Sequence, residues 1–194
     1  MRKVIVSMNI TLDGYMSGPG GELDWHFAFW DPHMGERLAK ELSQADTILL
    51  GRVTYEAMAS FFPHKTTDAL CPRDEYGYAV MMNHYQKAVF SRRLNSAEWN
   101  NTLIIKEDIE EGMKKLRDSS GRLQKNIMVY GSGRLVSALI RLDMIDEYQL
   151  WIHPVLIGKG KPFFGKYFDQ QDLRLLTTTT FPSGVVLLHY EVER

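Results

Sequence analysis

Residues 129–140, VYGSGRLVSALI, join an apolar run to a helix-like pattern through a Gly-Ser-Gly turn. The first turn of a helix leaves backbone N–H groups without intrahelical partners, and the helix dipole adds partial positive charge there. A phosphate fits at such a site when the backbone comes close, and Gly131 and Gly133 carry no Cβ to obstruct it. Ser132 adds a hydroxyl donor. The stretch predicts an anion site, with an ordinary turn and helix cap as the alternative.

A second strand-to-helix turn occurs in LLGRVTYEAM, residues 49–58. Gly51 ends the strand, Arg52 follows it, and Thr54 is placed to cap the helix. The turn combines a helix N-terminus with an adjacent cation, an arrangement that suits a bound anion. The alternative interpretation is an ordinary helix cap beside a solvated arginine.

A third turn, VFSRRL, covers residues 89–94 and places Ser91, Arg92 and Arg93 directly after a buried strand. Arginine suits phosphate because its planar guanidinium group binds two oxygens at once. A pair of solvated basic side chains is the alternative interpretation.

All three turns follow strands, and in an open α/β sheet ligands bind outside the carboxyl ends of the strands. We therefore expect the turns to open onto one edge of a sheet and to hold a dinucleotide. Two arginine-bearing turns favour a 2′-phosphate over a free ribose, and so NADPH over NADH. The Rossmann fingerprint does not fit, because Val136 stands where a third glycine or alanine belongs.

Hydrophobic periodicity predicts the elements that position these turns. Strands are expected at 3–10, 46–51, 87–91, 101–105 and 126–130. Amphipathic helices are expected at 32–44, at 53–61, around Ile109, Met113 and Leu116, and along Leu135, Val136, Leu139 and Ile140. The glycine-rich residues 11–25 indicate a loop that can close over a site. Residues 62–86 are ambiguous, with a helix around 74–84 as one interpretation.

The C-terminal part predicts antiparallel strands. Residues 146–158 form a long apolar run, and Pro154 inside it indicates an edge strand or a bulge. The last two strand-like runs flank Pro182-Ser183-Gly184, which is typical of a hairpin. The whole pattern predicts an α/β fold with a mixed, mostly parallel central sheet, helices on both faces and antiparallel strands at the C-terminal edge.

Composition argues against several function classes. With 23 basic and 24 acidic residues, the net charge of −1 gives no electrostatic reason to expect nucleic acid or membrane as a partner. The N-terminal apolar run is too short and too polar for a signal peptide or a membrane span. Cys71 is the one cysteine, which precludes an internal disulfide, and the six histidines show no metal-ligand spacing. We expect a cytoplasmic protein that binds a small molecule and no metal.

Five segments together resemble the reductases of the dihydrofolate reductase fold, and more closely the branch containing the reductase domain of riboflavin biosynthesis. They are SMNITLDGYMSG, ILLGRVTYEAM, VFSRRL, IMVYGSGRLVSALI and IDEYQLWIHPVLIGKGKPFFG. The resemblance implies one reductase domain over residues 1–194, NADPH as cofactor and a homodimer. The cofactor-binding residues that it implies are Gly51, Arg52, Thr54, Ser91, Arg92, Gly131, Ser132, Gly133, Arg134 and Leu135.

At the substrate end, true dihydrofolate reductase carries a buried acid on its first helix. Counting back from the GRVT turn reaches Gly35 and Glu36, and Gly35 fits the count better, which argues against folate. The riboflavin-branch pattern favours Asp13 near the substrate or nicotinamide, with Glu36 and Asp24 as further candidate proton donors. Trp25 resembles the tryptophan beside the pteridine ring. A plain Asp-Gly turn and a core tryptophan are the alternatives.

The leading hypothesis is an NADPH-dependent reductase of a small heterocyclic or carbonyl substrate. Pyrimidine reduction of the riboflavin-biosynthesis type stands ahead of dihydrofolate or pterin reduction. A non-catalytic NADPH-binding module and a scaffold dimer whose turns are only helix caps are the alternatives. Lys159 and Lys161 can contact a substrate phosphate or a second subunit, or can be solvated loop lysines.

Overall fold

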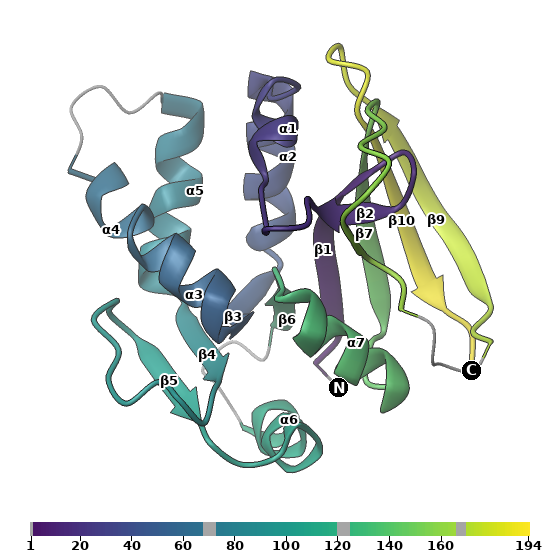
Figure 1. Cartoon of the computed structure of the whole chain (residues 1–194). Helices are drawn as coiled ribbons and strands as arrows, with labels where there is room; N and C mark the ends of the chain where they lie inside the picture. Colours follow the sequence, from purple (N-terminus) through teal and green to yellow (C-terminus); the bar gives the residue numbers. More distant parts are fainter. Residues whose placement is uncertain (1, 68–72, 120–124, 166–169) are drawn as a thin grey trace.

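The computed structural model describes residues 2–67, 73–119, 125–165 and 170–194. In these ranges, eight strands form one sheet in the order β5-β4-β3-β6-β1-β7-β10-β9 (Figure 1). The first six strands are parallel, whereas β10 runs antiparallel to β7 and β9. The strands are β1 (Val4–Thr11), β3 (Ala45–Gly51), β4 (Gln86–Phe90), β5 (Thr102–Ile105), β6 (Asn126–Val129), β7 (Glu147–His153), β9 (Leu173–Thr180) and β10 (Val186–Val192).

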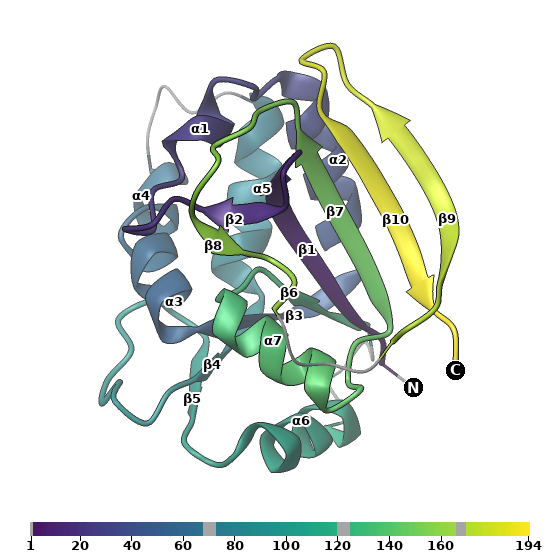
Figure 2. The ribbon, with the colours of Figure 1, turned by 45° about the vertical axis from the view of Figure 1, so that its right-hand side comes forward.

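Helices cover both faces of this sheet (Figure 2). One face carries α2 (Pro32–Leu42), α3 (Arg52–Ala59), α4 (Phe62–Lys65) and α5 (Arg73–His84), and the other carries α6 (Ile109–Asp118) and α7 (Gly133–Arg141). The predicted fold class is therefore confirmed, together with the hairpin between β9 and β10. The helix considered around 74–84 is also confirmed, while residues 68–72, and with them Cys71, lie outside the described ranges.

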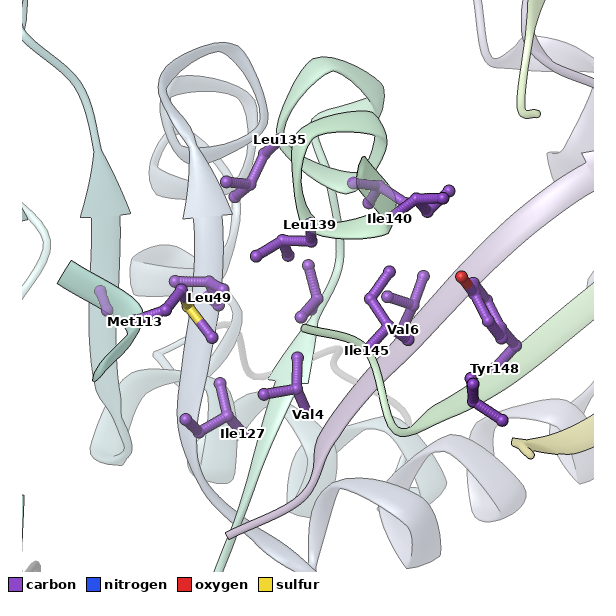
Figure 3. Close-up of a cluster of buried hydrophobic side chains, with 14 of the residues drawn as sticks. Val4, Val6, Leu49, Met113, Ile127, Leu135, Leu139, Ile140, Ile145 and Tyr148 are labelled. Atoms are coloured by element: carbon purple, nitrogen blue, oxygen red, sulfur yellow. The ribbon is translucent and has the colours of Figure 1, made fainter. Parts of the chain in front are cut away.

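The core consists of two main clusters, one on each face, because successive side chains of a strand point to opposite sides. In β3, Leu49 packs with α6 and α7, whereas Ile48 and Leu50 pack with residues of α2, α3 and α5. Figure 3 shows Leu135 and Leu139 of α7 pointing toward the sheet. Burial of each such side chain contributes about 1.5–3 kcal/mol. This packing fixes where the N-terminus of α7 stands at the sheet edge.

Two small elements occupy the segment that was predicted to be a loop. In residues 11–25, β2 (Tyr15–Ser17) pairs with β8 (Lys161–Pro162), and α1 (Asp24–Phe27) follows as a single turn of helix. The peptide N–H of Phe163 donates to the carbonyl of Gly14 at 2.9 Å and helps to hold the two segments together. Because these contacts join segments about 145 residues apart, local periodicity could not reveal them.

The strand predicted over residues 146–158 is shorter than expected and lies elsewhere in the sheet. It ends at His153, directly before Pro154, and β7 lies between β1 and β10 instead of at an edge. The prediction of an edge strand or a bulge was therefore wrong. Proline lacks a backbone N–H, so it ends the strand here and leaves His153 as the last residue at its carboxyl end.

Candidate active site

The three predicted turns meet at one edge of the sheet. They line a cleft of about 380 Å³ at the carboxyl ends of β3, β4 and β6. We call it the arginine cleft; it is lined by Gly51, Arg52, Val53, Phe90, Ser91, Arg92, Arg93, Ile109, Ser132, Arg134 and Leu135. Thr54 and Gly131 are not among the lining residues, but they directly adjoin Val53 and Ser132, which are. A Cβ on Gly131 would be 3.3 Å from the Thr54 hydroxyl oxygen. The predicted convergence of the turns is confirmed.

The helices α3 and α7 begin side by side at this cleft (Figure 2). Their N-cap residues, Gly51 and Ser132, make no side-chain capping hydrogen bond, and neither helix has an acidic residue in its first turn. Instead, Arg52 opens α3 and Arg134 follows the first residue of α7. A cation at a helix N-terminus opposes the helix dipole. Two such ends facing one cleft make it strongly favourable to an anion.

The arginines of the cleft differ in their partners. Arg52 pairs with Glu56 one turn along α3, with nitrogen–oxygen distances of 2.6 and 2.8 Å. Arg92, Arg93 and Arg134 form no ion pair with any residue in the described ranges. These three guanidinium groups are exposed and available to a multiply charged ligand.

The glycines of the turns serve contacts within the chain. A Cβ on Gly51 would lie 2.5 Å from the Ser132 hydroxyl oxygen, and one on Gly133 would lie 2.0 Å from the Met16 methyl carbon. Gly131 adopts a φ of +109°, which side chains rarely tolerate. The glycines therefore bring β3, β6 and β2 close together. Glycine is therefore required at these positions by packing within the chain. The sequence had suggested only that the missing Cβ atoms leave room for a phosphate.

A second cavity of about 320 Å³ adjoins the arginine cleft. It shares Phe90, Ser91, Arg92 and Ile109 with the cleft and extends to the start of α6. The hydroxyl oxygen of Ser91 accepts from the backbone N–H groups of Arg93 and Leu94, at 3.1 and 2.9 Å. Ser91 therefore shapes the turn that presents Arg92, and its own hydroxyl hydrogen stays available to a ligand.

An aromatic pocket lies at the opposite end of α3. It has a volume of about 350 Å³ and is lined by His26, Phe27, Trp30, Leu38, Phe61, Phe62, Lys65, Glu75, Tyr78 and Ala79. Within this lining, Lys65 forms an ion pair with Glu75 at 2.8 Å. The Lys65 ammonium also lies 4.9 Å from the centre of the Phe61 ring. The described lining is thus mainly apolar and suits a planar ring. This pocket was not predicted from the sequence, because Phe62, Tyr78 and Ala79 of its lining lie in the ambiguous region 62–86.

His153 stands at the carboxyl end of β7, beside Thr11 at the end of β1. Its Nε2 lies 3.0 Å from the Asn9 side-chain oxygen, and its ring is covered by Trp25, His26 and Phe29 at centroid distances of 5.2–6.0 Å. Burial, with a smaller contribution from His26, lowers the pKa of His153 to about 4. The imidazole is therefore neutral at physiological pH.

Sequence comparison places this architecture in a known family. Residues 2–187 match the RibD C-terminal domain. The chain belongs to the RibD C-terminal domain family. Over 189 residues it is 36% identical to the uncharacterized protein YyaP of Bacillus subtilis. The aligned region covers 97% of this chain and 94% of YyaP.

Solved structures of RibD-like proteins share the fold. A putative riboflavin biosynthesis protein from Shewanella superposes with a TM-score of 0.74 at 20% identity and covers 99% of both chains. A Thermotoga maritima deaminase/reductase superposes with a TM-score of 0.67 at 15% identity; the match covers 99% of this chain and 57% of that protein. The present chain thus corresponds to one part of the Thermotoga protein.

Asp13, a candidate catalytic residue, braces the loop after β7 in this RibD-family chain. Its carboxylate accepts from the backbone N–H groups of Ile157 and Gly158, at 3.1 and 2.8 Å, and from the Thr11 hydroxyl. The Thr11 hydroxyl first, and these backbone amides with it, lower the pKa of Asp13. An ionised carboxylate with three donors is suited to positioning this loop, rather than to donating a proton.

The other polar candidates at the substrate end are exposed. Glu36 faces solvent, whereas Gly35, the position that fitted the family count better, is buried on the inner face of α2. Asp24, in the first position of α1, is exposed, as are Lys159, in the loop that leads to β8, and Lys161, the first residue of β8. The structure therefore brings none of these four charged side chains into the aromatic pocket.

The described parts of the RibD-family chain contain neither a cluster of metal ligands nor a helix that could cross a membrane. No three His, Cys, Asp or Glu side chains in those parts are grouped so that they could hold a metal ion. Among the helices that the structure describes, none has the length and apolar composition needed to span a bilayer.

Proposed function

We propose that this RibD-family protein is an NADPH-dependent reductase of a small heterocyclic or carbonyl substrate. The observation that carries the proposal is the arginine cleft, where the uncapped N-termini of α3 and α7 face the same space as four arginines. Such an arrangement is electrostatically unfavourable until an anion binds there. A dinucleotide with a pyrophosphate and an additional phosphate supplies charges at several points of the cleft.

The residues of the cleft fit the parts of this cofactor. The N-termini of α3 and α7, with the Ser132 hydroxyl, would bind the pyrophosphate. Arg92, Arg93 and the Ser91 hydroxyl would bind the 2′-phosphate, since arginine forks match phosphate oxygens. The adjoining cavity between β4, β5 and α6 would hold the adenine.

When bound, NADPH supplies a hydride. The protein has to position the acceptor, and α3 is well placed to do so because it begins at the arginine cleft and leads to the aromatic pocket. The apolar walls of that pocket would hold a planar ring and exclude water. We infer that solvent water delivers the accompanying proton, because Asp13 is an ionised brace and Glu36 is exposed.

The family match supports a pyrimidine substrate ahead of a folate. The Thermotoga relative is a 5-amino-6-(5-phosphoribosylamino)uracil reductase by name. Folate is disfavoured here because Gly35, not an acid, stands on the inner face of α2. A homodimer and a cytoplasmic location stay predictions, to be tested by light scattering and by cell fractionation.

A non-catalytic NADPH-binding module is the second candidate function. It is favoured by one observation: in the described lining of the aromatic pocket the one carboxylate, Glu75, is engaged by Lys65. Such a module would bind NADPH without transferring its hydride.

Turnover separates the two candidates. The protein would be incubated with NADPH and, in turn, with pyrimidinones, pterins and simple carbonyl compounds, while the fluorescence of the reduced nicotinamide is followed. A reductase oxidises NADPH with at least one class, and deuterium from labelled NADPH then appears in the product. Binding of NADPH with no oxidation by any class would favour the non-catalytic module.

A further inference from the structure

Two buried polar atoms near the aromatic pocket have no partner in the described structure. The indole Nε1 of Trp25 and the imidazole Nδ1 of His153 are both shielded from solvent and form no hydrogen bond there. The two rings are neighbours, with centroids 5.2 Å apart in a T-shaped arrangement. His153 itself is 0% exposed. Buried polar groups are nearly always satisfied, so two unsatisfied groups side by side call for an explanation.

The chemistry of the two atoms is complementary. The Asn9 side-chain oxygen can only accept, so the Nε2 atom of His153, 3.0 Å away, must carry the ring proton and donate it. In a neutral imidazole the other nitrogen, Nδ1, then holds a lone pair. Indole Nε1 is a donor only. Trp25 Nε1 is thus an unpaired donor, and His153 Nδ1 beside it is an unpaired acceptor.

The position of the pair connects it to the aromatic pocket. Trp25 belongs to α1, and the next two residues of that helix, His26 and Phe27, line the pocket. His153 lies underneath, at the carboxyl end of β7. Because α1 is only four residues long and makes no side-chain capping bond, a small displacement of it would open the pair toward the pocket.

We propose that Trp25 Nε1 and His153 Nδ1 together bind the edge of a planar amide, in which an N–H and a C=O group lie next to each other. The carbonyl accepts from the indole, and the N–H donates to the imidazole. The subsite deepens the proposed reductase function, on which it rests for its role, by assigning the substrate class: a cyclic amide whose ring lies against the aromatic pocket. The carboxamide of the cofactor's nicotinamide carries the same chemistry and is the other source of such an edge.

Nuclear magnetic resonance of nitrogen-15-labelled protein tests this assignment without turnover. The indole signal of Trp25 is identified with the Trp25→Phe variant, and the ring signals of His153 with His153→Gln. Uracil serves as the simplest planar amide probe, and dimethyluracil, with both ring N–H groups methylated, as its matched control. NADP⁺ alone forms a separate arm for the nicotinamide carboxamide.

We expect uracil to shift the Trp25 indole and His153 Nδ1 signals, and dimethyluracil to leave both nearly unchanged. Trp25→Phe keeps an aromatic ring at this position and removes no hydrogen bond within the described chain, because the Trp25 Nε1 has no partner there. The variant should weaken uracil binding about three- to tenfold. His153→Gln retains a donor at the Nε2 position but places no acceptor at the Nδ1 position, with a similar effect. His33→Gln, which alters an exposed histidine outside the lining of the aromatic pocket, should bind uracil as the wild type does.

A response to NADP⁺ and not to uracil would support the amide subsite and assign it to the cofactor. No response to either ligand, or a proton found on His153 Nδ1, would overturn the proposal even if NADPH occupies the arginine cleft. Conversely, a uracil response in a protein that does not bind NADPH would leave the subsite standing and refute the reductase function.

Discussion

Gly51 and Ser132 touch where β3 and β6 pass into their helices. A Cβ on Gly51 would lie 2.5 Å from the Ser132 hydroxyl oxygen and 3.0 Å from its backbone nitrogen, and the Gly51 N–H donates to the Gly131 carbonyl at 2.8 Å. One missing methyl group therefore lets the N-termini of α3 and α7 stand together. The proposed pyrophosphate site depends on this contact.

Gly51→Ala should separate the two turns, because the backbone of Ser132 cannot move as a flexible side chain can. We expect a loss of about 1–3 kcal/mol in the free energy of unfolding, measured by urea titration, and weaker NADPH binding. Gly77→Ala in α5, where a Cβ would meet nothing within 4 Å, should be neutral or stabilising. Equal stability of the two variants would contradict the packing argument.

Gly133 and Met16 provide a second contact of this type. A Cβ on Gly133 would lie 2.0 Å from the Met16 methyl carbon, at the far end of a flexible side chain. Gly133→Ala should cost less than Gly51→Ala, because the Met16 side chain can rotate away, and less still when Met16 is already alanine. The double-mutant cycle is measured by chemical denaturation. Additive effects would show that Met16 does not explain the glycine.

Asp13 should act by positioning the loop after β7. Asp13→Asn keeps an oxygen that can accept from Ile157 and Gly158, whereas Asp13→Ala removes it. Only the alanine variant should show faster hydrogen exchange at those two amides and a clear fall in kcat/KM with an active substrate. If Asp13→Asn lost as much kcat as Asp13→Ala, Asp13 would be the proton donor instead.

Lys87 should make the stability of the fold depend on pH. Its buried ammonium donates to the carbonyls of Met82 and Asn83, at 3.2 and 2.8 Å, and burial lowers its pKa from 10.5 to about 8. Between these two values the unfolded chain binds more protons than the folded one, so the free energy of unfolding rises with pH. Below about pH 8 both states are charged and this contribution is constant.

The measurement compares the wild type with Lys87→Met between pH 7 and pH 10. The gain in stability across this range should be about 1–3 kcal/mol larger in the wild type, because the methionine cannot titrate. Parallel pH profiles for the two proteins would contradict the assigned pKa shift.

The arginine cleft was predictable because its determinants are local. Two of the turns consist of a strand, a glycine, an arginine and a helix start, and the third consists of a strand, a serine and two arginines. The parallel order of the strands then places all three turns at one edge. The contacts of Gly51 with Ser132 and of Gly133 with Met16 were not predictable, because they join residues more than 80 positions apart.

The surroundings of the aromatic pocket depend on contacts between distant segments and were largely missed. In sequence, His153 is an isolated polar residue before a proline, and its contacts with Asn9 and Trp25 come from segments far away along the chain. The one local signal was Pro154, which ends β7 and marks His153 as the residue at the carboxyl end of the strand. Because Pro154 was interpreted as the mark of an edge strand or a bulge, His153 was not named as a candidate residue.

The proposed binding of NADPH in the arginine cleft is tested by a calorimetric titration of the wild type, Arg92→Ala and Arg141→Ala with NADPH and with NADH. Arg141 lies exposed at the far end of α7 and serves as the matched control. We expect the wild type and Arg141→Ala to bind NADPH at least about tenfold more tightly than NADH, and Arg92→Ala to lose most of this preference. Equal affinity of the wild type for the two nucleotides, or a preference that survives in Arg92→Ala, would contradict the proposed binding.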